Sequence, residues 1–170
     1  MGIVGAIWGI GGMLFLLSSA IFRLGKLTLD AFAYDLSWYH WLVLVANLIF
    51  MAYSEGYKGF QKSFSPRLAA RARHLRNHPR LLHVFLAPFF CAGFFCTTRR
   101  RQLGVVILTL GIVVLILIVH RLPQPWRGII DAGVVLGLTW GLVSVVHQVV
   151  QAFTSPDFNA SPEMAVGYRP

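Results

Sequence analysis

Long apolar stretches, almost without charged residues and separated by polar segments, are the dominant pattern along the chain. They cover residues 2–22, 38–53, 103–119 and 128–150. The hydrocarbon core of a bilayer is about 30 Å thick, and an α-helix of roughly 20 apolar residues crosses it. We therefore expect an all-α integral membrane protein in which these four stretches are transmembrane helices.

Residues 81–98 form a fifth apolar stretch, and its path is ambiguous. As one straight helix it would just cross the bilayer, which gives the alternative of five spans. That path would put the basic residues before and after it on opposite sides, against the positive-inside rule. Pro88 and Gly93 also interrupt its middle. We therefore favour a re-entrant hairpin on the cytoplasmic side, where protein must cover any irregular backbone.

The segment between the second span and this hairpin, residues 54–80, has a helical pattern of its own. Tyr53, Tyr57, Phe60 and Phe64 recur at steps of four, three and four, which predicts one face of a helix. Ser65-Pro66 then has the composition of a new helix start, with Ser at the N-cap and Pro first. We expect a short basic amphipathic helix, ending before Pro79, that lies on an anionic membrane surface.

Composition supports the membrane assignment. Hydrophobic residues make up 56% of the 170-residue chain and charged residues only 12%, whereas about a quarter of residues are charged in an average soluble protein. We expect a single helical bundle over residues 1–152. The polar, proline-containing residues 153–170 have the composition of a disordered tail.

The net charge of +9 is concentrated at two places. Residues 54–80 carry seven Lys or Arg against the single acid Glu55, and Arg99, Arg100 and Arg101 follow the hairpin. The positive-inside rule explains this distribution without a nucleic-acid partner. It places both termini and the basic residues in the cytoplasm, and indicates a bacterial inner (cytoplasmic) membrane.

These cations exceed what orientation alone requires, and each juxtamembrane Lys or Arg contributes about 1 kcal/mol toward an anionic leaflet. A solvated loop that only sets topology is the plain alternative. The functional alternative is a surface that docks anionic lipid headgroups or an acidic partner protein. Its candidate residues are Lys58, Lys62, Arg67, Arg71, Arg73, Arg76, Arg80, Arg99, Arg100 and Arg101, with Tyr57, Phe60 and Phe64 beside them.

Glycines repeat at helical spacing in the first and fourth spans. Gly133, Gly137 and Gly141 share one face, as do Gly5 and Gly9. Small residues at this spacing allow two membrane helices to approach closely. We expect packing of the first span on the fourth, with a homo-oligomer or a partner membrane protein as the alternative.

Asp131 is the only acidic residue within a predicted span. Intramembrane acids are costly and indicate ion or proton pathways by default. Arg127 lies four residues earlier, however, so the two side chains can pair along the helix. A structural ion pair is therefore the first interpretation, and an ion or proton site of a small transporter is the second.

The histidines permit one specific cofactor hypothesis. His40 and His120 fall near the outer face, and His83 and His147 near the inner face, as the axial ligands of a two-haem membrane cytochrome would. Cys91 and Cys96 lack metal or redox spacing, and we expect no metal ligands and no catalytic group.

These patterns favour a non-enzymatic accessory, assembly or scaffold protein that docks anionic lipid or a partner complex through its basic residues. A transporter or channel that uses the hairpin and Asp131 is the alternative, and a haem-binding electron-transfer protein is the second alternative.

Overall fold

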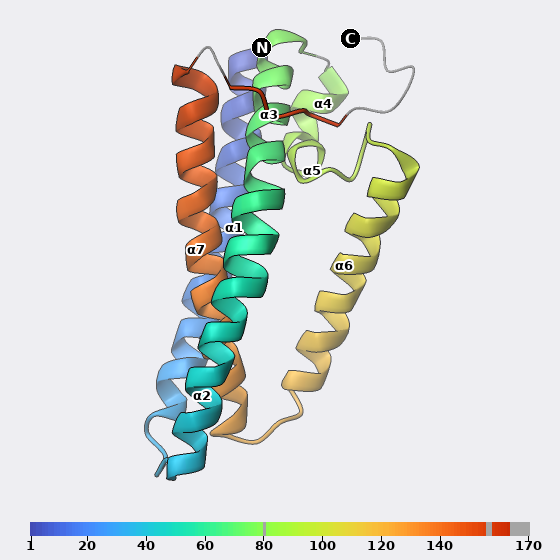
Figure 1. Cartoon of the computed structure of the whole chain (residues 1–170). Coiled ribbons are helices and arrows are strands. Elements are labelled where there is room, and N and C mark those ends of the chain that lie inside the picture. The colour runs from blue at the N-terminus through green and yellow to red at the C-terminus, as the bar shows by residue number, and fades with distance from the viewer. Residues whose placement is uncertain (80, 156–157, 164–170) are drawn as a thin grey trace.

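The computed structural model describes residues 1–79, 81–155 and 158–163, except for the side chains of residues 100 and 101. These residues form helices and no β-strand, so the predicted all-helical fold is confirmed. In chain order the elements are α1 (Gly2–Ala31), α2 (Trp38–Met51), the π-helix η1 (Ala52–Phe64), α3 (Ser65–Asn77), α4 (Leu81–Phe85), α5 (Ala87–Ala92), α6 (Arg99–Val119) and α7 (Trp126–Thr154), as Figure 1 shows.

Three helices of the described residues are long and apolar enough to cross a membrane. They are α1, the part of α6 that begins at Gln102, and α7. The second predicted span, residues 38–53, is not among them, because the α-helix α2 has only 14 residues. Three of the four predicted spans therefore have a helix of spanning length.

The elements α2, η1 and α3 follow one another without a break and form one long rod (Figure 1). Their 14, 13 and 13 residues make a helix up to about 60 Å long at 1.5 Å per residue. Helix α3 begins at Ser65, has Pro66 in its first turn and ends before Pro79, as predicted. Ser65 is not a non-helical N-cap, however, because its φ and ψ of −61° and −45° continue the rod.

The rod, α1 and α7 pack together as a bundle, in which α7 contacts both of the others (Figure 1). At one end Gly128 of α7 meets Ala31 of α1, and at the other Gly2 of α1 meets Arg76 of α3. The rod and α7 therefore run parallel, and α1 runs antiparallel to both. We call the end with the N-terminus, α3, α4, α5 and residues 158–163 the basic end, and the end with Trp38 and Trp126 the aromatic end.

Helix α3 belongs to this bundle and does not lie separately on a surface, which corrects the expectation of a surface helix. Its predicted apolar stripe, Leu68, Ala72 and Leu75, is fully buried. The stripe joins the main hydrophobic core together with Phe90 and Val145. The stripe itself is confirmed, but it faces neighbouring helices.

The first span packs on the fourth as predicted, since α1 and α7 contact each other. The glycine stripe of α7 does not form that contact, because it faces the rod. A Cβ at Gly133 would collide with the Asn47 side chain, and at Gly137 it would lie 3.1 Å from Cβ of Glu55. At Gly141 it would lie 2.5 Å from the Phe60 ring. Each glycine therefore gives the rod room for one larger side chain. The step from Glu55 to Phe60 is five residues because η1 is a π-helix.

Residues 81–98 contain no helix of spanning length, because they divide into two short helices and a turn. Helices α4 and α5 pack along the first turns of α1, where Gly5 faces Val84 and Gly9 faces Cys91. Gly93 ends α5 in a left-handed conformation with φ of 93°. The interruption predicted at this glycine is confirmed, and the chain reverses there.

Helix α6 stands apart from the bundle and is exposed along nearly its whole length (Figure 1). Of its described side chains, Val105 near its start and Val119 at its end are covered. An apolar helix exposed on all sides is compatible with a lipid environment.

Candidate functional site

The predicted docking cations differ in exposure. Lys58, Lys62, Arg76 and Arg99 are exposed, Arg67 and Arg73 are partly buried, and Arg71 is buried. Arg80 and the side chains of Arg100 and Arg101 lie outside the described residues. The predicted docking residues therefore combine exposed cations on η1, α3 and α6 with one internal arginine on α3.

The exposed lysines lie on a pair of tyrosines. The rings of Tyr53 and Tyr57 stack with centroids 6.1 Å apart. The ammonium of Lys58 lies 5.5 Å from the Tyr53 ring, and that of Lys62 lies 4.6 Å from the Tyr57 ring. Cation–π contacts of this kind hold an ammonium beside an aromatic face.

The other half of the predicted aromatic face turns inward. Phe60 fits against Gly141 of α7, and Phe64 packs on the main core. A π-helix turns less per residue than an α-helix, so the step of three from Tyr57 to Phe60 leaves the shared face, whereas the steps of four keep Tyr53 with Tyr57 and Phe60 with Phe64. Phe60 and Phe64 are therefore packing residues, whereas Tyr53 and Tyr57 remain near the surface.

Arg71 connects α3 to residues 81–98, which we call the reversed segment, and to residues 158–163, which we call the tail. Its side chain is 2% exposed, and Nη1 donates to the carbonyls of Phe90 at 2.8 Å and Phe95 at 2.9 Å. Nε donates to Pro162 at 3.0 Å. The guanidinium also lies 5.3 Å from the Phe90 ring. These contacts give Arg71 a structural role that its place in a charged series did not indicate.

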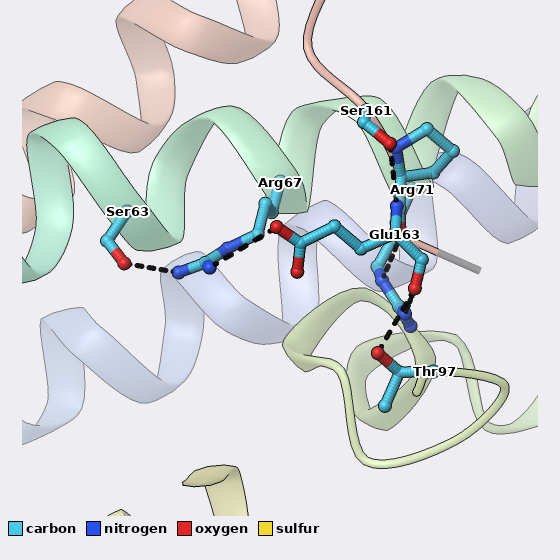
Figure 2. A network of polar contacts seen from close by, with 7 residues as sticks. Ser63, Arg67, Arg71, Thr97, Ser161 and Glu163 are labelled. Atoms are coloured by element: carbon cyan, nitrogen blue, oxygen red, sulfur yellow. Dashed lines mark hydrogen bonds and ion pairs between the residues drawn. The ribbon is translucent and has the colours of Figure 1, made fainter. Parts of the chain in front are cut away.

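Residues 158–163 lie along α3, although a disordered tail was expected from residue 153 onward. Arg73 donates to the carbonyl of Phe158, and Thr97 donates through Oγ1 to the carbonyl of Glu163 at 3.1 Å. The Glu163 carboxylate lies 3.8 Å from Nη1 of Arg67. Figure 2 shows Arg67, Arg71 and Thr97 converging on Glu163. Sequence analysis missed this network because it depends on a contact between α3 and a distant tail.

A cavity of about 330 Å³ lies beside this network. Its polar lining includes Ser63, Arg67, Thr97 and Glu163. The opposite wall is formed by the first turns of α6. The cavity thus joins a cationic surface to the apolar surface of a helix that can cross a membrane.

His74 on α3 is another group perturbed by this environment. Burial lowers the pKa of His74, and the nearby charges of His78, Arg71 and His83 lower it further. The rings of His74 and His78 stack with centroids 4.8 Å apart. His74 is therefore neutral near pH 7, and protonating it would place another positive charge beside Arg71.

At the aromatic end, the two predicted haem ligands have protein partners. His40 accepts a hydrogen bond at Nδ1 from the backbone of Ser37 and lies 4.8 Å from the Trp126 ring. His120 Nδ1 lies 2.9 Å from an amino nitrogen of Arg127. A haem on either histidine would have to displace these contacts.

At the basic end, His83 stacks on Phe90 at 4.8 Å and its Nε2 lies 3.4 Å from Cys96 Sγ, while His147 is exposed on α7. The structure gives the predicted haem pairs no support. Cys91 is buried in the core, as expected for a small apolar side chain. Among the described residues, no group of three or more His, Cys, Asp or Glu gathers to hold a metal ion.

The predicted pairing of Asp131 with Arg127 is confirmed. Nε of Arg127 lies 3.8 Å from Oδ2 of Asp131, whose side chain is buried near the start of α7. Asp131 therefore has a partner of opposite charge at the expected spacing, as its structural interpretation requires.

Glu55 is a partly buried acid that the sequence assigned to the cytoplasmic segment. It faces Gly137, about one third of the way along α7. A signal for this position exists in the sequence, since Asn47, Met51 and Glu55 repeat every four residues, as the glycines of α7 do. Asn47 also donates to the carbonyl of Ile129 at 2.8 Å.

In the part of the chain that the structure describes, the fold is all-helical, and three helices are long and apolar enough to cross a bilayer, which indicates a membrane-associated protein. No protein-family model, no curated protein and no solved structure matches the chain.

Proposed function

We propose that this is a non-enzymatic accessory or scaffold protein of a bacterial inner membrane, which attaches its basic end to anionic phospholipid. The observation that carries the proposal is the set of exposed cations on the rod, above all Lys58 and Lys62 on their tyrosines. Anionic headgroups attract cations at this boundary, and the tyrosines hold the ammonium groups there.

The length of the rod supports the orientation. About 20 helical residues cross a hydrocarbon core of about 30 Å. Counted from Trp38 at the aromatic end, the opposite boundary falls near Lys58. The 21 residues of α6 between Arg99 and Val119 match the same thickness. In this orientation the rod supplies the second of four spans, both termini are cytoplasmic, and α3 extends beyond the bilayer.

The reversed segment agrees with the same orientation. Helices α4 and α5 lie beside the first turns of α1, so both ends of residues 81–98 are at the basic end. A short re-entrant hairpin at the cytoplasmic boundary is the path we propose. Helices α1 and α3 cover its backbone.

The strength of the attachment follows from the number of exposed cations. At about 1 kcal/mol for each Lys or Arg near an anionic leaflet, Lys58, Lys62 and Arg99 contribute roughly 3 kcal/mol, and Arg76, farther from the boundary, adds less. This corresponds to a preference of about 10² for an anionic over a neutral surface. Screening reduces the preference as ionic strength rises.

The test is the phospholipid retained when the protein is extracted from mixed phosphatidylglycerol and phosphatidylcholine bilayers. The test variant replaces the exposed cations with glutamine: Lys58→Gln, Lys62→Gln, Arg76→Gln and Arg99→Gln. The control is Arg23→Gln with Lys26→Gln, which removes two cations from the half of α1 that is nearer the aromatic end. We expect phosphatidylglycerol enrichment in the wild type and the control, and its loss in the test variant.

Equal enrichment in all three proteins would reject lipid attachment through these cations. Co-purification of an acidic protein that only the test variant loses, without lipid enrichment, would replace lipid by a protein partner. Resistance to alkaline extraction shows that each variant is still inserted.

A further inference from the structure

The cavity beside Arg67 has walls of opposite character. Ser63 and Arg67 of the rod, Thr97 after α5 and Glu163 of the tail provide its polar wall. Gly104, Val105 and Leu108 of α6 provide the wall that faces them. A cavity with a cation on one side and an apolar helix on the other fits an amphiphile with an anionic head.

Arg67 is placed to bind an anion. Its side chain is 22% exposed, and one amino group donates to Ser63. The other amino group lies 3.8 Å from the Glu163 carboxylate, whereas charge-assisted hydrogen bonds measure about 2.7–2.9 Å. The contact with Glu163 is therefore a loose ion pair. A guanidinium has five N–H donors, so Arg67 can donate hydrogen bonds to an anion that comes closer.

The backbone of Glu163 is anchored by hydrogen bonds with three residues. Its carbonyl accepts hydrogen bonds from Thr97 at 3.1 Å and from Arg71 at 3.3 Å, and its N–H donates to Ser161 at 3.2 Å (Figure 2). The carboxylate, 40% exposed, thus reaches the cavity from an anchored main chain. The chain places one of its own anions where a ligand anion would bind.

The apolar wall identifies the side from which the ligand enters. Gly104, Val105 and Leu108 belong to the part of α6 that is long and apolar enough to cross a membrane. A ligand that contacts this wall approaches from the bilayer. A volume of about 330 Å³ is at the lower end for ligand pockets, which suits a phosphate headgroup whose acyl chains remain outside along α6.

We propose that this cavity binds the phosphate headgroup of one anionic phospholipid on Arg67, and that the Glu163 carboxylate competes for the same cation. The proposal rests on the proposed function, because it requires the basic end to face an anionic leaflet. It goes further by assigning a single stoichiometric site and a competing group on the tail.

The experiment is native mass spectrometry of the full-length protein titrated with phosphatidylglycerol in detergent. Glu163→Gln removes the competing charge, and a partly exposed ion pair of this strength corresponds to a roughly two- to fivefold gain in affinity for the first lipid. Arg67→Gln removes a charged donor, and we expect at least about a tenfold loss. Arg73→Gln is the matched control, since Arg73 lies on the same helix outside the cavity.

Unchanged affinity for the first lipid in Glu163→Gln would overturn the competition. Unchanged affinity in Arg67→Gln would overturn the site. Because Glu163 lies on the tail, its variant tests the proposal even where Arg67→Gln fails to fold. Displacement of the first lipid by millimolar inorganic phosphate would identify a free-anion site and reject the lipid.

The variant that lacks the four exposed cations separates this proposal from the proposed function. If the cavity binds lipid and the proposed function fails, this variant keeps both the bulk phosphatidylglycerol enrichment of the wild type and its affinity for the first lipid. If the proposed function holds and the cavity proposal fails, the variant loses bulk enrichment, and Arg67→Gln changes nothing.

Discussion

Replacing Arg71 by methionine tests whether a single buried guanidinium holds the reversed segment against α3. Methionine keeps the length and much of the volume of the side chain but donates no hydrogen bond. The carbonyls of Phe90 and Phe95 then lose charged donors at 2.8 and 2.9 Å. Each such bond contributes about 1.5–3 kcal/mol, so we expect local opening of α5 to become easier by about 3 kcal/mol or more.

Cys91 reports this opening. Its thiol is buried against Gly9 of α1, and burial raises the pKa of Cys91 from 9.0 to about 12. Since the thiolate is the reactive form, maleimide labelling at pH 8 requires α5 to leave α1. A change of about 3 kcal/mol corresponds to a labelling rate about 100-fold higher.

The assay is the rate of maleimide labelling in a Cys96→Ser background, followed by intact mass spectrometry. Arg73→Met serves as the control, because Arg73 lies on the same helix and its hydrogen bond goes to the carbonyl of Phe158 in the tail, at 3.5 Å, and not to α5. A labelling rate for Cys91 in Arg71→Met within about twofold of the control would refute the reasoning. In that case core packing of Phe90, and not the guanidinium, would hold the segment.

Two further predictions concern packing and pH. Gly141→Ala places a methyl group 2.5 Å from the Phe60 ring and should destabilise the bundle by about 1–3 kcal/mol. A Cβ at Gly111 would meet nothing within 4 Å, so Gly111→Ala should leave the thermal midpoint in detergent unchanged. Equal thermal midpoints for Gly141→Ala and Gly111→Ala would contradict the close fit of Phe60 against Gly141. Because burial lowers the pKa of His74 in the folded protein, the unfolded chain binds the proton more readily. Stability should be constant above the ordinary histidine pKa of about 6.5 and decrease as pH falls below it. His74→Gln should flatten this decrease between pH 7 and 5, and an unchanged pH profile would exclude His74 as its cause.

The sequence alone determined the features that depend on local pattern. Runs of apolar residues predicted helices able to cross a bilayer, since lipid requires every backbone group to bond within its own helix. The spacing of Arg127 and Asp131 predicted their ion pair, because residues four apart share a helix face. Gly93 predicted a chain reversal, because glycine readily adopts positive φ.

Only the tertiary structure decided which surfaces meet. The spacing of Gly133, Gly137 and Gly141 predicted close helix packing, but a periodic surface does not identify its partner, which proved to be the rod. The π-helical turns of η1 moved Phe60 and Phe64 inward, because one added residue per turn changes every later direction.

The same limit applies to charge. Arg71 and Arg76 both belong to the basic residues between 54 and 80, and no local pattern distinguishes them. In the structure Arg71 is buried and donates to backbone carbonyls, whereas Arg76 is exposed. Arg67 meets Glu163 only because the tail returns across α3. Contacts between residues so far apart follow from the packing of the whole bundle, and no local pattern encodes them.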